Sequence, residues 1–117
     1  MPVTLAALIK IAPFKQEARQ DLLARLDKLS EEQKTTLSDT CWTVLSQMYY
    51  AKLRYEQEML MLEIQEGKRK FNKKDFEEVE KKVTEEFVQK LKAAQTRESV
   101  EEIREELKKH FRKPKAS

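Results

Sequence analysis

Apolar residues recur along most of this chain at intervals of three and four positions, which is the period of a helix buried along one side. The pattern predicts four to five helices. They are a short helix or extended arm within residues 1–13, a helix over about 14–28, a long helix over about 31–66, a helix over about 73–95, and a last helix that follows Thr96. We therefore expect an all-α fold, a small helical bundle of four to five helices with one long central helix (about 31–66) and an antiparallel partner helix (about 73–95).

The long helix is delimited at both ends. Ser30 and Gln33 have the spacing of a capping box, in which each side chain accepts a hydrogen bond from the backbone amide of the other residue. Neither proline nor glycine occurs between this box and Gly67, so we expect one helix of about 36 residues and about 54 Å. Asn72 is a suitable cap for the helix that follows, and the phenylalanines at positions 71 and 76 flank it as a hydrophobic staple.

The stretch from Thr40 to Ile64 carries two apolar stripes, and it holds the only Trp, the only Cys and all three Tyr residues of the chain. The first stripe is Cys41, Val44, Met48, Ala51, Tyr55, Met59 and Leu62, and the second is Trp42, Leu45, Tyr49, Leu53, Leu60 and Ile64. Two adjacent stripes predict a central helix that is buried on more than one side.

Two functional interpretations compete with this structural one. A small-molecule pocket between helices, or an interface with another protein, could be lined by Trp42, Met48, Tyr49, Tyr55 and Met59. A helix of about 54 Å overruns a bundle of this size, so part of it must be covered by the helix over 73–95, by a kink, or by a second copy of the chain. A homodimer is therefore a candidate assembly, in which the apolar segment 1–13 could exchange onto the partner.

Length and composition fit one domain. The 117 residues are 39% hydrophobic and 38% charged with a single glycine, which is too apolar for a disordered chain and too poor in turn residues for an all-β fold. We assign residues 1–112 to a single helical domain and residues 113–117 to a flexible basic tail. One cysteine cannot form an intrachain disulfide, and no apolar run reaches the ~20 residues of a membrane span, so we expect a cytoplasmic protein without membrane contact.

The net charge of +3 is unevenly distributed, since residues 1–66 carry 8 Lys/Arg against 10 Asp/Glu and residues 67–117 carry 16 against 11. Two basic clusters could contact phosphate groups. They are Lys68, Arg69, Lys70, Lys73 and Lys74, and, near the C-terminus, Lys108, Lys109, Arg112, Lys113 and Lys115. Acidic residues adjoin both clusters and no DNA-reading motif is present, so nucleic-acid binding is an alternative function and not the leading one.

Catalytic and metal-binding chemistry find little support in the sequence. The only histidine, His110, follows Glu106 by four residues on the predicted last helix, and we expect a solvated pair there instead of a metal site. Cys41 belongs to an apolar stripe and is far from His110 in sequence, which is typical of an inert core thiol. The near absence of glycine argues against a phosphate-binding loop. We expect no catalytic residues, no cofactor and no metal.

The sequence therefore predicts a non-enzymatic helical protein-interaction domain, acting as a self-associating scaffold or as an adaptor. Nucleic-acid binding through the two basic clusters and small-molecule binding within the bundle are the alternatives.

Overall fold

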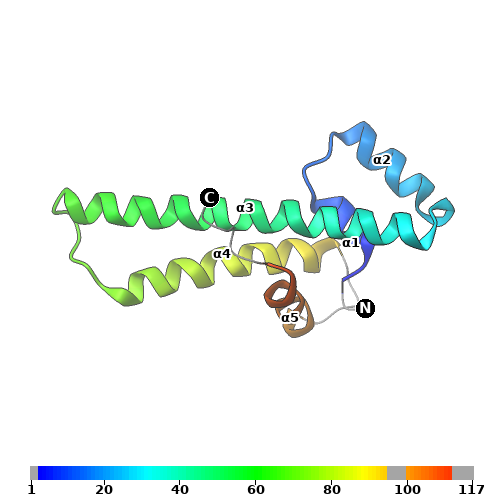
Figure 1. Ribbon diagram of the computed structural model, residues 1–117. Helices are drawn as coiled ribbons and strands as arrows, with labels where there is room; N and C mark the ends of the chain where they lie inside the picture. Colours follow the sequence, from blue (N-terminus) through cyan, green and yellow to red (C-terminus); the bar gives the residue numbers. More distant parts are fainter. Residues whose placement is uncertain (1–2, 95–99, 112–117) are drawn as a thin grey trace.

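Five α-helices and one turn of 3-10 helix make up the computed structural model, which describes residues 3–94 and 100–111 (Figure 1). In chain order they are α1 (Leu5–Ile11), α2 (Gln16–Arg25), the 3-10 turn η1 (Leu26–Lys28), α3 (Glu31–Gln65), α4 (Lys73–Ala94) and α5 (Val100–His110). The described residues contain no strand, and the predicted all-α bundle is confirmed. Thr96 and the predicted tail 113–117 lie outside the described residues.

The longest element, α3, begins and ends where the sequence predicts. The Gln33 amide donates to the Ser30 hydroxyl at 3.1 Å, and the Ser30 amide donates to the Gln33 side chain at 2.9 Å. Both bonds satisfy amides that the first turn of a helix leaves without partners. α3 then runs without interruption for 35 residues, and the molecule is 57 Å long. Gly67 follows with a φ of 77°, a left-handed conformation that glycine adopts at little cost.

α4 folds back along α3 as its antiparallel partner (Figure 1). The Lys74 amide donates to the Asn72 side chain at 3.0 Å, so Asn72 caps α4 as predicted. The rings of Phe71 and Phe76 lie 5.7 Å apart, as a hydrophobic staple requires. The side of α4 that is buried carries Val83, Phe87, Val88 and Leu91.

α1 is a short helix that packs against both α3 and α4. The Ala7 amide donates to the Thr4 hydroxyl at 3.2 Å, which caps its first turn. Ala7, Leu8 and Ile9 are buried. The apolar N-terminal segment is thus a helix and not an extended arm, and one chain covers it without a partner.

One continuous core joins α1, α3, α4 and α5. Its largest buried side chains include Leu8, Ile9, Leu45, Leu91 and Ile103. Along α3 this core reaches Leu53, and Leu60 is buried outside it. From about residue 55 to residue 80, α3 and α4 are the only elements among the described residues that run side by side (Figure 1). The molecule therefore consists of a five-helix body and a two-helix extension, which we call the hairpin end.

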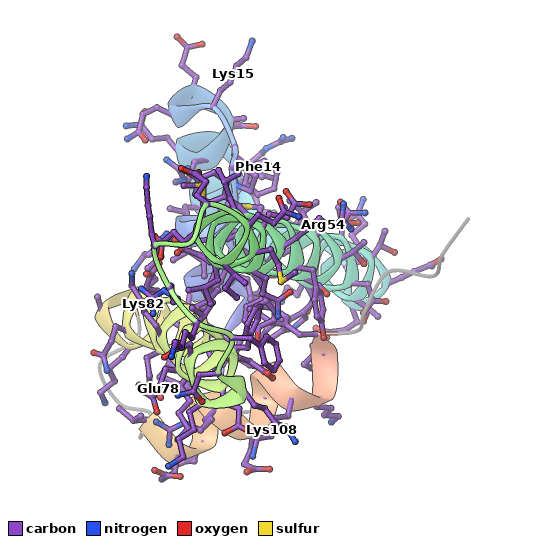
Figure 2. All side chains as sticks on the ribbon, turned by 90° about the vertical axis from the view of Figure 1, so that its left-hand side faces the viewer. Phe14, Lys15, Arg54, Glu78, Lys82 and Lys108 are labelled. Carbon is purple, nitrogen blue, oxygen red and sulfur yellow. The ribbon has the colours of Figure 1, made fainter. Side chains whose placement is uncertain are left out.

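α2 is attached to the body more loosely than the other helices, because none of its residues is buried. Leu22 and Leu23 pack partly buried against the core. The Arg19 guanidinium adds hydrogen bonds, donating to the carbonyl oxygens of Ile9 at 3.3 Å, Ala12 at 3.0 Å and Phe14 at 3.0 Å. α2 lies beside the N-terminal end of α3, on the side away from α4 (Figures 1 and 2). It does not extend over the hairpin end.

Candidate functional site

One side of α3 carries large apolar side chains that the chain leaves exposed. Tyr55 is 60% exposed, Leu62 45%, Met59 40% and Met48 37%, and the smaller Ala51 is exposed between them. These residues recur at intervals of three and four positions, so they lie on one side of the helix over about 21 Å. We call these five residues the outer stripe.

The prediction that both apolar stripes of α3 are buried is therefore wrong for one of them. Cys41, at the start of the first stripe, is buried, but from Met48 onward this stripe faces solvent. The second stripe packs into the molecule, and its buried members are Trp42, Leu45, Tyr49, Leu53 and Leu60. The reason is geometric. Among the described residues, α4 alone runs beside α3 at the hairpin end, and one neighbouring helix leaves the side with Tyr55, Met59 and Leu62 uncovered (Figure 1).

The five residues predicted to form an interface or a pocket are split between these two sides. Trp42 and Tyr49 are buried, whereas Met48, Tyr55 and Met59 belong to the outer stripe. Met48 and Tyr49 point about 100° apart, and here Tyr49 faces the core whereas Met48 faces solvent. The structure does not bring the five together as one site.

Trp42 instead lies in a cluster with α5. Its ring is stacked on that of His110, with centroids 4.2 Å apart and planes inclined by 8°. His110 Nε2 is 2.9 Å from Oε2 of Glu106. Glu106 is buried, so the prediction of a solvated Glu106–His110 pair is wrong. Docking of α5 against α3 and α4 covers this side of the helix.

Two open grooves flank the Trp42 cluster. One, of about 430 Å³, runs past Asp39, Thr43 and Gln47 of α3, and the other, of about 330 Å³, passes between Leu5 and Lys34. Small-molecule sites are mostly apolar and enclosed. Both grooves are open to solvent and not enclosed, so their geometry adds little to the small-molecule alternative.

The hydroxyl and thiol groups of the core are held away from solvent. Burial raises the pKa of the Cys41 thiol to about 11, so this thiol is protonated at neutral pH and is a poor nucleophile. Burial also raises the pKa of Tyr49, whose hydroxyl lies 2.9 Å from that of Thr84. In the part of the chain that the structure describes, no three His, Cys, Asp or Glu side chains gather as metal ligands would.

The first basic cluster is partly neutralised by its neighbours. Arg69 lies 2.8 Å from Glu63 and 3.2 Å from Asp75, and these hydrogen bonds raise the pKa of Arg69. Lys68 lies 3.0 Å from Glu66. The remaining members, which are exposed, are Lys70, Lys73 and Lys74. Arg69 thereby joins the last turn of α3 to the first turn of α4.

The second basic cluster is described only in part. Lys108 lies 3.6 Å from Glu105, and Lys109 is exposed beside the larger groove. Arg112, Lys113 and Lys115 lie outside the described residues. The structure therefore shows no continuous basic face made by this cluster among residues 100–111.

Sequence reasoning named three members of the outer stripe as interface candidates and did not name Ala51 and Leu62. Ala51 and Leu62 belong to the same apolar stripe as Met48, Tyr55 and Met59, and this spacing could have identified them. Sequence reasoning also did not name Arg54, which lies on the side of α3 away from α4 (Figure 2). No pattern in the sequence links Trp42 to His110, because only the docking of α5 brings them together.

None of the helices in the described part of the chain combines the length and the apolar character needed to cross a bilayer. Comparisons of the chain with protein-family models, curated proteins and solved structures find no match.

Proposed function

We propose that this chain is a non-enzymatic interaction module that self-associates through the outer stripe of α3. The observation that carries the proposal is the exposure of Met48, Tyr55, Met59 and Leu62 on one side of one helix. Single exposed apolar side chains are ordinary on protein surfaces, but a contiguous row of large ones is typical of an interaction site.

The chemistry of the outer stripe supports this proposal. Tyrosine and methionine are enriched in protein interfaces, where tyrosine adds a large rigid area and methionine adapts to the opposing surface. Spacing of three and four along a straight helix also suits the side-by-side packing of two helices, in which side chains of one insert between those of the other. α3 presents this row on a side that α4 leaves exposed.

Nucleic-acid binding has less support. Ion pairs with Glu63, Asp75 and Glu66 engage two of the five residues in the first basic cluster.

A reducing, cytoplasmic setting stays a prediction from the single cysteine.

The test is the solution mass by light scattering on a sizing column, at protein concentrations of tens of micromolar. The wild-type chain is expected at twice the 13.9 kDa of one chain. Met59→Glu places a carboxylate inside the outer stripe, so this variant is expected at the mass of one chain. The wild-type dimer should persist at high salt because its contacts are mainly apolar.

Met61→Glu is the matched control. Met61 is 43% exposed on the same helix, against 40% for Met59, but it lies outside the outer stripe. It should leave the dimer intact, and circular dichroism should show equal helix content in both variants. A wild-type monomer, or equal dissociation by both substitutions, contradicts the proposal.

A further inference from the structure

Charge changes sign along the outer stripe at Tyr55. On the N-terminal side of Tyr55 lie Lys52 and Arg54, and on its C-terminal side lie Glu56, Glu58, Glu63 and Glu66. Lys52 already bonds Glu86 of α4, and Glu63 bonds Arg69. Arg54 and Glu58 are exposed and flank the stripe on the same side, because four residues make little more than one turn.

This order of charges distinguishes the two ways in which a second copy could pack. In a parallel pair, the acidic part of each helix, from Glu56 to Glu66, runs level with the same acidic part of the other. In an antiparallel pair centred on Tyr55, the basic part of each helix lies level with the acidic part of the other. Like charges held side by side weaken association, and opposite charges favour it.

We infer that the occupant of the outer stripe is a second copy of this chain, packed antiparallel with Tyr55 near the twofold axis. This inference rests on the proposed function. In this register, Met48 lies opposite the partner's Leu62, and Ala51 lies opposite the partner's Met59, so a small side chain meets a large one. Arg54 lies within about 3 Å, along the helix axis, of the level of the partner's Glu58.

The position of α2 agrees with the antiparallel arrangement. α2 lies on the outer side of α3 at its N-terminal end (Figures 1 and 2). A parallel pair brings both copies of α2 to the same end of the interface. In the antiparallel register the partner's Gln65, the last residue of its α3, reaches the level of Leu45, so each copy of α2 lies beyond the end of the other helix.

Cysteine crosslinking tests this register. Gln47 and Gln65 are both exposed, and they are 18 residues or five turns apart, so they lie on the same side of α3. In a Cys41→Ala background, Gln47→Cys and Gln65→Cys are made as separate chains with different affinity tags. After subunit exchange, a short bismaleimide is expected to join the two different chains, whose cysteines lie within about 3 Å of the same level.

The same reagent should not join two copies of Gln65→Cys, because their cysteines are about 30 Å apart along the axis. A crosslink between two copies of Gln65→Cys in a protein of dimer mass shows a parallel pair. That result overturns this inference and leaves the proposed function standing. A dimer that yields neither crosslink, although each cysteine reacts with a monofunctional maleimide, overturns the inference as well. A monomer overturns the proposed function itself.

Charge reversal gives a second measurement that does not depend on crosslinking. Arg54→Glu is expected to raise the dissociation constant roughly five- to tenfold, because the twofold axis repeats the contact. Adding Glu58→Arg to the same chain should recover most of that loss. Lys81→Glu on α4 makes the same change of charge away from the outer stripe and should leave association unchanged. Failure of the double variant to recover contradicts the antiparallel register.

Discussion

At the scale of single residues, the most informative contact is the ion pair between Lys52 of α3 and Glu86 of α4. The hydrogen bond from Lys52 lowers the pKa of Glu86 below its ordinary value of 4.5, and nearby Lys82 and Lys90 lower it further. Both partners are partly exposed, so this pair contributes at most about 1 kcal/mol. Its stabilisation is nevertheless tied to pH.

Folding favours the ionised form of Glu86, so the stabilisation is complete above the unfolded pKa and is lost as the pH falls through the lower folded pKa. Glu86→Gln should therefore lower the free energy of unfolding by about 0.5–1 kcal/mol at pH 7 and by progressively less below pH 4.5. Urea unfolding followed by circular dichroism between pH 3 and pH 7 measures this difference. Glu77→Gln, at an exposed position of the same helix, is the control, and a difference independent of pH would contradict the assignment.

Local contacts could be read from the sequence at this scale, and distant ones could not. The bonds between Ser30 and Gln33 join residues three positions apart, so spacing alone predicts them. The stack of Trp42 on His110 joins residues 68 positions apart and depends on how α5 docks. The burial of Glu106 could not be predicted for the same reason. It depends on the neighbouring helices and not on the residues of its own helix.

At the scale of elements, helix boundaries were predictable and the coverage of each helix was not. Ser30, Gly67 and Asn72 mark ends because capping and left-handed turns are local properties. Which apolar stripe of α3 is buried depends on how many helices lie beside it. The sequence shows two stripes, but among the described residues the hairpin end supplies only α4 as a neighbour, which leaves Tyr55, Met59 and Leu62 in solvent.

α2 gives a prediction at this scale because one of its side chains makes three hydrogen bonds to the chain that precedes it. Arg19→Ala removes the three bonds to the carbonyl oxygens of Ile9, Ala12 and Phe14, each worth roughly 1 kcal/mol. Amide hydrogen exchange in α2 should accelerate by ten- to a hundredfold, while amides in the buried parts of α3 and α4 keep their protection.

Arg25→Ala is the control for this experiment. Arg25 also lies on α2, but it pairs only with the exposed Asp21 at 2.6 Å. Its loss should change exchange in α2 little. Equal acceleration in both variants would show that Arg19 does not anchor the helix.

At the scale of the whole molecule, self-association couples stability to concentration. A dimer is favoured over the unfolded chain by mass action, so the melting temperature of the wild-type protein should rise by several degrees over a hundredfold increase in protein concentration. Circular dichroism melts at about 5 and about 500 μM measure this shift. Met59→Glu should melt at the same temperature at both concentrations, whereas Met61→Glu should follow the wild type. A wild-type melting temperature that does not move argues against association.

The two-part shape of the molecule also determines which part of it tryptophan fluorescence reports on. The only indole of the chain, that of Trp42, lies in the body beside His110 and Phe111, whose ring centroids are 4.2 Å and 6.0 Å away. Its ultraviolet emission therefore changes when α5 leaves the body. The emission does not respond to events around Phe71, between α3 and α4. The emission of this one indole follows the body alone, and events at the hairpin end need a second probe.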